Sequence, residues 1–284
     1  MNQLKKPIFC LGIGAQKAGT TWLYNYLDHF SNVRMGPIKE YHVWDAVYQL
    51  DEKGAGMSKP DEDWPSGIKN SIAEFFGKPV KTRVQYRFRI KPNRYFDYFE
   101  SILKGKNTIL TGDISPSYSG LPVQAFERIK TTFESRGIEV RVVFLMRDPV
   151  NRCWSAVQMF KRNGNTRFFD GGMEANEALS IYGGSAHANI RCDYQKTLEN
   201  IYKVFSPENV YVGLYENMFE AENVKNLSHF FGLPATQDFV QNKFNVGNSD
   251  TGPSPEAALK IQTKYAAVYE YCRREYPETK KLWR

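Results

Sequence analysis

Long apolar runs are missing from the sequence, and none approaches the roughly eighteen apolar residues that a membrane-spanning helix needs. Residues 1–19 begin with a pair of lysines before a short apolar run, without the long apolar region and cleavage site of a secretory signal. Cysteine is scarce and forms no Cys-x-x-Cys pair, which argues against a zinc site and favours a reducing compartment. The four cysteines are Cys10, Cys153, Cys192 and Cys272. We therefore expect a cytoplasmic protein with no membrane span and no metal.

Internal repeats and low-complexity tracts are also missing. The sequence is 42% hydrophobic and 24% charged, as in soluble globular proteins, so disordered, collagen-like and coiled-coil classes are excluded. Its 284 residues permit one large or two small domains. A single domain over residues 1–284 is the simpler expectation.

Acidic residues are outnumbered, with 31 Asp and Glu against 38 Lys and Arg, which gives a net charge of +7. This balance suits an anionic ligand, a nucleic acid or a membrane surface, and charge alone does not choose among them. The basic residues are scattered apart from one group, which solvation or an acidic acceptor explains equally well. That group is Lys81, Arg83, Arg87, Arg89 and Lys91.

Four short apolar runs, bounded by glycine, proline or polar residues, predict buried strands of a parallel sheet at 8–13, 108–111, 140–146 and 210–214. Apolar residues at helical spacing predict helices between them, at 20–30, 150–160 and 193–205. Strands that alternate with helices predict an α/β fold with a central, mostly parallel sheet flanked by helices. Its ligand crevice is expected at the carboxyl ends of the strands.

Two stretches rich in glycine and polar residues, 49–69 and 162–184, predict irregular excursions from this fold. Such loops serve as lids or binding loops about as often as they form plain surface insertions.

The first predicted strand leads into a glycine-rich loop and then a helix, an arrangement that lets backbone N–H groups surround a phosphate. Gly14 and Gly19 have the spacing of the nucleotide-binding P-loop, but Thr20 occupies the position of its lysine and Lys17 lies inside the loop. The strand at 140–146 is followed by Arg147, so the carboxylate of a magnesium site is missing as well. These departures argue against ATP or GTP hydrolysis, although a loop that merely turns remains the plain alternative.

A second anion-binding feature follows the third predicted strand. Arg147 lies at the carboxyl end of that strand, and Ser155 lies two turns into the next helix on the side that faces back. A guanidinium and a hydroxyl placed in this way can bind a second phosphate group. Two separate anion-binding features predict a ligand with two phosphate groups.

These motifs resemble those of sulfotransferases that use 3′-phosphoadenosine 5′-phosphosulfate (PAPS). Residues 16–23, Gln-Lys-Ala-Gly-Thr-Thr-Trp-Leu, resemble the 5′-phosphosulfate loop of that family, and residues 143–155 resemble its 3′-phosphate motif. Residues 39–45 and 112–118 are similar to segments of the heparan sulfate sulfotransferase branch, and residues 194–216 follow the pattern of bacterial members. The resemblance implies a P-loop-type three-layer fold and a metal-independent transferase with PAPS as donor and adenosine 3′,5′-bisphosphate as product.

The resemblance also implies roles for individual residues. Lys17 would stabilise the leaving group, Trp22 would lie against the adenine, and Arg147 with Ser155 would bind the 3′-phosphate, although Trp22 alone is also explained as core packing. The 5′-phosphate would be held by the rest of the loop. Those cofactor-binding residues are Gln16, Lys17, Ala18, Gly19, Thr20 and Thr21.

Glu40 matches the general base of the heparan sulfate branch, where a carboxylate takes the proton of the attacking hydroxyl. A surface carboxylate is the plain alternative for Glu40. His42 is a second candidate base or orients Glu40, and Lys39 is otherwise a solvated charge. The branch has a basic loop over the 3′-phosphate, whereas residues 245–249 here are uncharged, and Asp113 replaces its glutamate.

The expected acceptor is a hydroxyl or, second, an amine of a small molecule or glycan, and the sequence leaves its identity and the oligomeric state open. The alternatives are a nucleotide kinase or NTPase and a non-enzymatic basic protein that binds nucleic acid or anionic lipid. Thr20 in place of the P-loop lysine argues against the first alternative. The placement of both anion-binding features between strands and helices argues against the second, so we expect no nucleic-acid partner.

Overall fold

A computed structural model describes residues 6–50, 80–169, 172–236 and 252–283. Its centre is a four-stranded, all-parallel sheet with the strand order β2-β1-β3-β4. The strands are β1 (Ile8–Gly14), β2 (Leu110–Ile114), β3 (Glu139–Met146) and β4 (Val210–Leu214). The α/β class predicted from the alternating pattern is confirmed.

Three of the predicted strands agree with the structure within one residue, whereas β2 extends to Ile114 instead of ending at residue 111. The extension includes the polar Asp113, which pairs in register with Leu11 of β1 and is fully buried. Hydroxyl groups of Ser115, Tyr95 and Tyr118 donate hydrogen bonds to its carboxylate. These hydrogen bonds compensate for burying the carboxylate, so the strand can continue through Asp113. Hydropathy alone ended the predicted strand before this residue.

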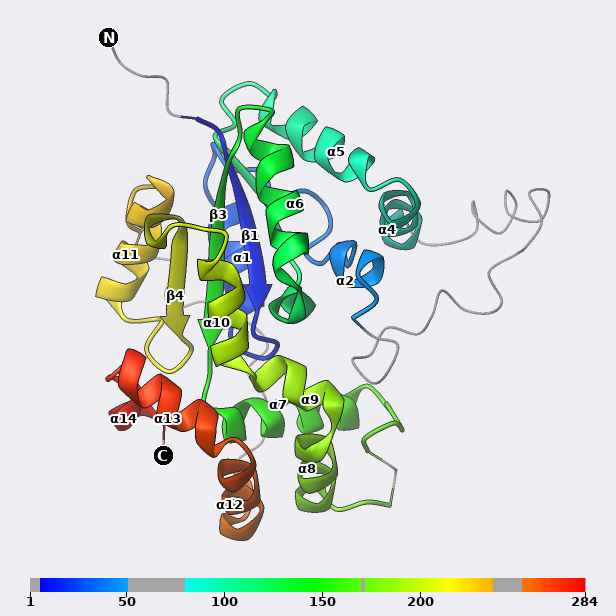
Figure 1. The fold of residues 1–284 in the computed structure, drawn as a ribbon, viewed down its shortest axis with the longest axis vertical. Coiled ribbons are helices and arrows are strands. Elements are labelled where there is room, and N and C mark those ends of the chain that lie inside the picture. Colours follow the sequence, from blue (N-terminus) through cyan, green and yellow to red (C-terminus); the bar gives the residue numbers. More distant parts are fainter. Residues whose placement is uncertain (1–5, 51–79, 170–171, 237–251, 284) are drawn as a thin grey trace, which may run out of the picture.

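Helices cover both faces of the sheet (Figure 1). α6 (Val123–Glu134) and α10 (Tyr194–Tyr202) lie in front of the strands in this view, and α1 (Thr20–Asp28) lies behind them. Further elements at the edges are α2 (Trp44–Val47), α4 (Val80–Ile90), α5 (Asn93–Leu103), α11 (Ala221–Phe231) and the 3₁₀ turns η1 (Pro116–Gly120) and η2 (Pro207–Asn209).

Aromatic side chains fill the space between β1 and the helices that pack on it. Phe9 of β1 stacks on Phe133 of α6 with ring centroids 4.1 Å apart, and meets Phe99 of α5 edge-on at 4.9 Å. All three side chains are fully buried. Such aromatic packing anchors the sheet whose strand ends carry the candidate site.

A layer of helices lies beyond the carboxyl ends of the strands, below the arrowheads in Figure 1. Its members are α7 (Pro149–Arg162), α8 (Ala175–Gly184), α9 (Ala186–Cys192), α12 (Pro255–Lys264), α13 (Ala266–Glu275) and α14 (Thr279–Leu282). Within the described ranges, no helix has both the length and the apolar character needed to cross a bilayer.

The structure corrects the predicted loop at 162–184, because its last ten residues form α8. Ala178, Leu179 and Tyr182 of this helix are buried, and their spacing gives α8 one apolar face. The glycines and asparagines around that stretch obscured the pattern. Of the other predicted loop, residues 51–69 lie outside the described residues, as do residues 245–249.

Candidate functional site

The loop between β1 and α1 has a backbone shape that depends on Gly19. This residue has a φ of 87° and begins α1, and a Cβ there would lie 2.6 Å from Sδ of Met218. Glycine alone satisfies both constraints without strain. Lys17, at the tip of the loop, also has a positive φ of 71°. The loop therefore brings a lysine and the start of a helix to the end of β1.

The turn between β3 and α7 carries Arg147. Asp148 caps α7 by accepting a hydrogen bond from the backbone N–H of Asn151 at 3.1 Å. Nη1 of Arg147 donates to the backbone oxygen of Lys17 at 2.9 Å, and its guanidinium lies 4.2 Å from the ring centroid of Tyr215. Nε of Arg147 is buried and has no hydrogen-bond partner among the described residues. An anionic oxygen in the adjacent cavity would satisfy it.

Lys17 and Arg147 make this end of the site strongly cationic. Burial lowers the pKa of Lys17 to about 8, and the charges of Arg162 and Arg147 act in the same direction. A buried ammonium among other cations gains most from an anionic ligand, which replaces the lost solvation.

The segment with Glu40 is fixed to the end of β2. The backbone N–H of Ile114 donates to the oxygen of Lys39 at 3.0 Å, and Asp113 accepts from the N–H of Tyr41. From α4, Gln85 donates to the backbone oxygen of Glu40 at 2.8 Å. Burial raises the pKa of Asp113 to about 6, against the lowering effect of its hydroxyl donors. Asp113 thus positions the Glu40 segment and does not line the cavity.

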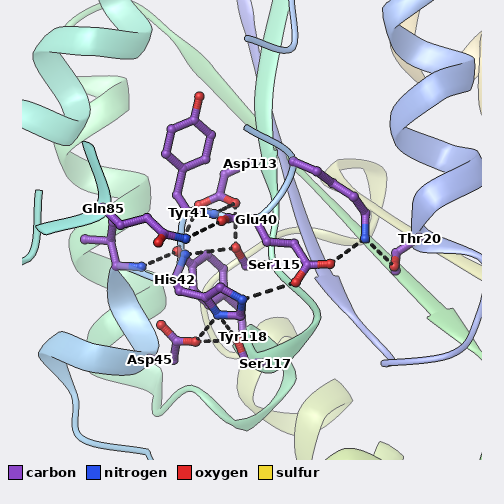
Figure 2. Close-up of polar contacts among 12 residues, drawn as sticks. Thr20, Glu40, Tyr41, His42, Asp45, Gln85, Asp113, Ser115, Ser117 and Tyr118 are labelled. Carbon is purple, nitrogen blue, oxygen red and sulfur yellow. Dashed lines mark hydrogen bonds and ion pairs between the residues drawn. The ribbon is translucent and has the colours of Figure 1, made fainter. Parts of the chain in front are cut away.

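Figure 2 shows a continuous chain of polar contacts from Thr20 to Asp45. Lys39 bridges Oγ1 of Thr20 at 3.2 Å and Oε1 of Glu40 at 2.6 Å. His42 then contacts the other carboxylate oxygen, with Nε2 3.1 Å from Oε2 of Glu40, and places Nδ1 2.7 Å from Asp45. Ser117 of η1 hydrogen-bonds to Asp45 as well. These contacts therefore link the Glu40 carboxylate to Thr20, at the end of the glycine-rich loop.

Charge alternates along this chain at neutral pH. Burial opposes ionisation of Glu40, but the hydrogen bond from His42 and the charge of Lys39 outweigh it and lower the pKa of Glu40 to about 2. Burial would likewise lower the pKa of His42, but hydrogen bonds to Asp45 and Glu40 raise it to about 9. His42 is thus a cation at pH 7 and has no free lone pair to act as a base, whereas Glu40 is ionised.

A cavity of about 250 Å³ brings most of the predicted site residues together. Ala18 is the exception, because its side chain is fully buried away from the cavity. Trp22 lines the cavity but also stacks on Tyr26 at 4.8 Å, so it has a packing role too. The predicted residues in the lining are Gln16, Lys17, Gly19, Thr20, Thr21, Trp22, Glu40, His42, Arg147 and Ser155.

Sequence reasoning missed five other residues of the lining: Pro116, Ser117, Met159, Arg191 and Tyr215. Pro116, Ser117 and Tyr215 closely follow β2 and β4, so the rule that ligands bind at strand ends could have found them. Met159 lies one turn beyond Ser155 on α7. Arg191 lies on α9, and no strand pattern pointed to it.

Residues from the C-terminal part of the chain hold the start of α7 through hydrogen bonds. Oε1 of Glu216 accepts a hydrogen bond from the N–H of Asp148 at 2.9 Å, and its Oε2 accepts one from Nε1 of Trp283 at 3.0 Å. Tyr269 of α13 donates to the Asp148 carboxylate at 3.1 Å. The turn that carries Arg147 is therefore held by residues 68 and 121 positions further along the chain than Asp148.

The cavity is suited to an anionic ligand with a reactive centre near a carboxylate. Lys17, Arg147 and the N-terminus of α1 supply positive charge, and Glu40 supplies the only carboxylate of its lining among the described residues. Within those residues no cluster of histidine, cysteine or carboxylate side chains has the arrangement of a metal site.

Comparisons with known proteins bear on the family and the fold of the chain. A family model described as "Sulfotransferase family" matches residues 7–238. The crystal structure of a sulfotransferase from Alicyclobacillus acidocaldarius is 14% identical, with a TM-score of 0.56 and coverage of 94% of each chain. The sulfotransferase domain from the curacin biosynthetic pathway is 15% identical with a TM-score of 0.45, covering 94% of this chain and 91% of its own. A comparison with curated protein sequences gives no match.

Proposed function

Because the chain belongs to the sulfotransferase family, we propose that it transfers the sulfuryl group of PAPS to a hydroxyl group, without a metal. The observation that carries the proposal is the single cavity shared by Lys17, Arg147 and Glu40. It combines two anion-binding features with a carboxylate, which are the parts that direct sulfuryl transfer requires.

Donor binding is assigned to the loop before α1 and the start of α7. The donor supplies an activated sulfuryl group on a phosphate that leaves as an anion. Lys17 and the backbone N–H groups at the start of α1 hold and stabilise the charge of that phosphate. Arg147, with its unpartnered Nε, and Ser155 hold the second phosphate.

Glu40 is assigned as the base that takes the proton of the acceptor hydroxyl. Its low pKa makes it a weak base while Lys39 and His42 both contact it. Lys39 also contacts Thr20, next to the site proposed for the phosphosulfate. An anion there draws Lys39 away from Glu40, which raises the basicity of the carboxylate when the donor is bound.

The acceptor belongs to the class of small molecules or glycans with a hydroxyl group. Incubating labelled PAPS with a panel of glycans, phenols, hydroxylated lipids and carrier-tethered β-hydroxy acids identifies the acceptor.

All four cysteines are free thiols, in keeping with the cytoplasmic location that we expect for the protein.

Calorimetry tests donor binding before any acceptor is known. We expect adenosine 3′,5′-bisphosphate to bind at least about tenfold more tightly than adenosine 5′-monophosphate, because the 3′-phosphate adds a charge-assisted contact. The Arg147→Ala variant should abolish that preference. Tight binding of MgATP, with no binding of PAPS or adenosine 3′,5′-bisphosphate, would contradict the proposal and favour a kinase or NTPase.

A further inference from the structure

Arg152 of α7 is a cation in the protein core. Its side chain is 0% exposed, and among the described residues its guanidinium contacts two thiols and a phenol. Nε donates to Sγ of Cys192 at 2.9 Å, Nη2 donates to Sγ of Cys153 at 3.1 Å, and both Nη atoms lie 3.2 Å from the hydroxyl of Tyr182. A buried cation is costly without an anion beside it, so negative charge on one of these partners stabilises it.

Cys153 is the partner whose pKa is lowered towards the anion. Burial raises the pKa of the Cys192 thiol and of the Tyr182 phenol, so both stay neutral. For Cys153, burial acts in the same direction, but the hydrogen bond with Cys192 and the charge of Arg152 outweigh it and lower the pKa. Cys153 and Arg152 thus form a buried thiolate–guanidinium pair next to a second thiol.

The two sulfur atoms are close enough to react with each other. Sγ of Cys153 lies 3.9 Å from Sγ of Cys192, and a disulfide bond of about 2 Å requires only modest movements of the two side chains. We propose that Cys153 and Cys192 form a peroxide-sensitive redox pair that Arg152 activates, located directly behind the wall of the candidate site.

The reaction consumes one molecule of hydrogen peroxide. The Cys153 thiolate attacks a peroxide oxygen, so the O–O bond breaks and a sulfenic acid and hydroxide form. The Cys192 sulfur then attacks the sulfenic sulfur, its proton joins the departing hydroxide as water, and the S–S bond forms. The first hydroxide takes up the proton that Cys153 lost when it ionised, so the peroxide is reduced to two water molecules as the two thiols are oxidised. A dithiol reductant reverses the change.

The pair lies next to residues of the cavity. Ser155, two positions after Cys153, and Arg191, directly before Cys192, both line it. A small neutral peroxide can reach the thiols from the cavity when α9 opens locally. Because the disulfide ties α7 to α9 and removes the anion beside Arg152, it shifts the wall that carries Ser155 and Arg191.

Two further cysteines provide a matched control inside the same chain. Cys10 and Cys272 are equally buried, and burial raises the pKa of both thiols, to about 12 for Cys272. The reduced full-length protein is treated with hydrogen peroxide, and the products are mapped by mass spectrometry. We expect the Cys153–Cys192 disulfide to form at least about tenfold faster than either control thiol is lost. Equal loss of all four thiols, or reaction only in denaturant, overturns the proposal.

Single variants separate the two steps. In Cys192→Ser, a dimedone probe should label Cys153 after peroxide treatment, whereas in Cys153→Ser it should not label Cys192. If Cys153→Ser fails to fold, Cys153→Asp returns an anion to Arg152 and should unfold at a higher temperature than Cys153→Ala. Labelling of Cys192 without Cys153, or a Cys153→Asp variant less stable than Cys153→Ala, contradicts the assignment of the thiolate.

A last measurement links the pair to the cavity and rests on the proposed function. Oxidised protein should bind adenosine 3′,5′-bisphosphate several-fold more weakly than reduced protein, and dithiothreitol should restore the affinity. Unchanged affinity with the disulfide present overturns the link to the site. If the reduced protein does not bind the nucleotide at all, the donor assignment fails, and the mapping experiment alone then decides whether the redox pair exists.

Discussion

Lys17 has a charge that depends on pH in the working range. Burial and the neighbouring arginines lower its pKa to about 8, so the ammonium is lost as the pH rises through that value. We expect kcat/KM for PAPS to fall above about pH 8, and Lys17→Ala to reduce kcat at pH 7 about a hundredfold or more, because the leaving phosphate loses its cation. Steady-state rates with a saturating acceptor measure both effects. A Lys17→Arg variant that retains activity at high pH would show that the loss of activity in the wild type comes from this residue.

Glu40 provides the test of general-base catalysis. Glu40→Gln keeps the size of the side chain, and its amide oxygen can still accept from Lys39 or from His42, although not from both. The amide cannot take a proton. We expect turnover to fall by about two to four powers of ten while the affinity for adenosine 3′,5′-bisphosphate stays within about twofold. Rate measurements give the change in turnover, and calorimetry gives the change in affinity. Turnover close to wild type would remove Glu40 from the base role.

His42 stabilises the folded protein through its contacts with Asp45 and Glu40. Hydrogen bonds to Asp45 and Glu40 raise its pKa from 6.5 to about 9 against the effect of burial, so the folded protein binds the proton more tightly than the unfolded chain. This contribution is fully present below about pH 6.5 and is lost as the pH rises through about 9. We expect His42→Gln to lower the free energy of unfolding by about 1–3 kcal/mol at pH 6 and by less at pH 9.5. Urea denaturation at both pH values measures it, and a loss that grows with pH would contradict the assignment.

At the scale of elements, β3 and α7 together form one anion-binding unit. Arg147 offers a charged group with an unpartnered Nε, whereas Ser155 offers one neutral hydroxyl. We expect Arg147→Ala to weaken binding of adenosine 3′,5′-bisphosphate by about 1–2 kcal/mol more than Ser155→Ala does. Calorimetry gives both affinities, with Arg94→Ala on the exposed side of α5 as the control. Equal affinity in wild type and Arg147→Ala would exclude the arginine from the site.

The elements also show how far sequence reasoning reaches. Continuous apolar runs located β1, β3 and β4 because a parallel sheet covered on both faces favours apolar residues at successive positions. The motif spacing brought Lys17 and Arg147 into one cavity, because the carboxyl ends of neighbouring parallel strands meet at one edge. Whether this edge binds PAPS stays a prediction.

Contacts between distant helices were beyond the same reasoning. Arg152 and Cys192 are forty positions apart, and only the packing of α7 against α9 brings them into contact. Likewise, α8 was missed because its apolar face is short and its neighbours are rich in glycine and asparagine. No local sequence pattern in these stretches predicts which distant residue each side chain contacts, so the contact is found only in the structure.

At the scale of the whole molecule, the contacts that support the site extend beyond the segment that the family match covers. That match ends at residue 238, yet Tyr269 and Trp283 contact the residues that hold the start of α7. Burial raises the pKa of Glu216, whose two oxygens join Trp283 to the backbone of Asp148. The C-terminal helices are therefore linked to the turn that carries Arg147.

Trp283→Phe tests this link, because phenylalanine keeps an aromatic, though smaller, side chain and cannot donate to Glu216. We expect the free energy of unfolding to fall by about 1 kcal/mol or more, since a buried carboxylate loses a donor. The affinity for adenosine 3′,5′-bisphosphate should fall several-fold as well, because a looser Glu216 no longer fixes Asp148 and, next to it, Arg147. Leu259→Ala, at an α12 position that is 62% exposed, serves as the control and should change neither quantity. Lower stability with unchanged affinity would mean that the C-terminal helices stabilise the fold without positioning the site.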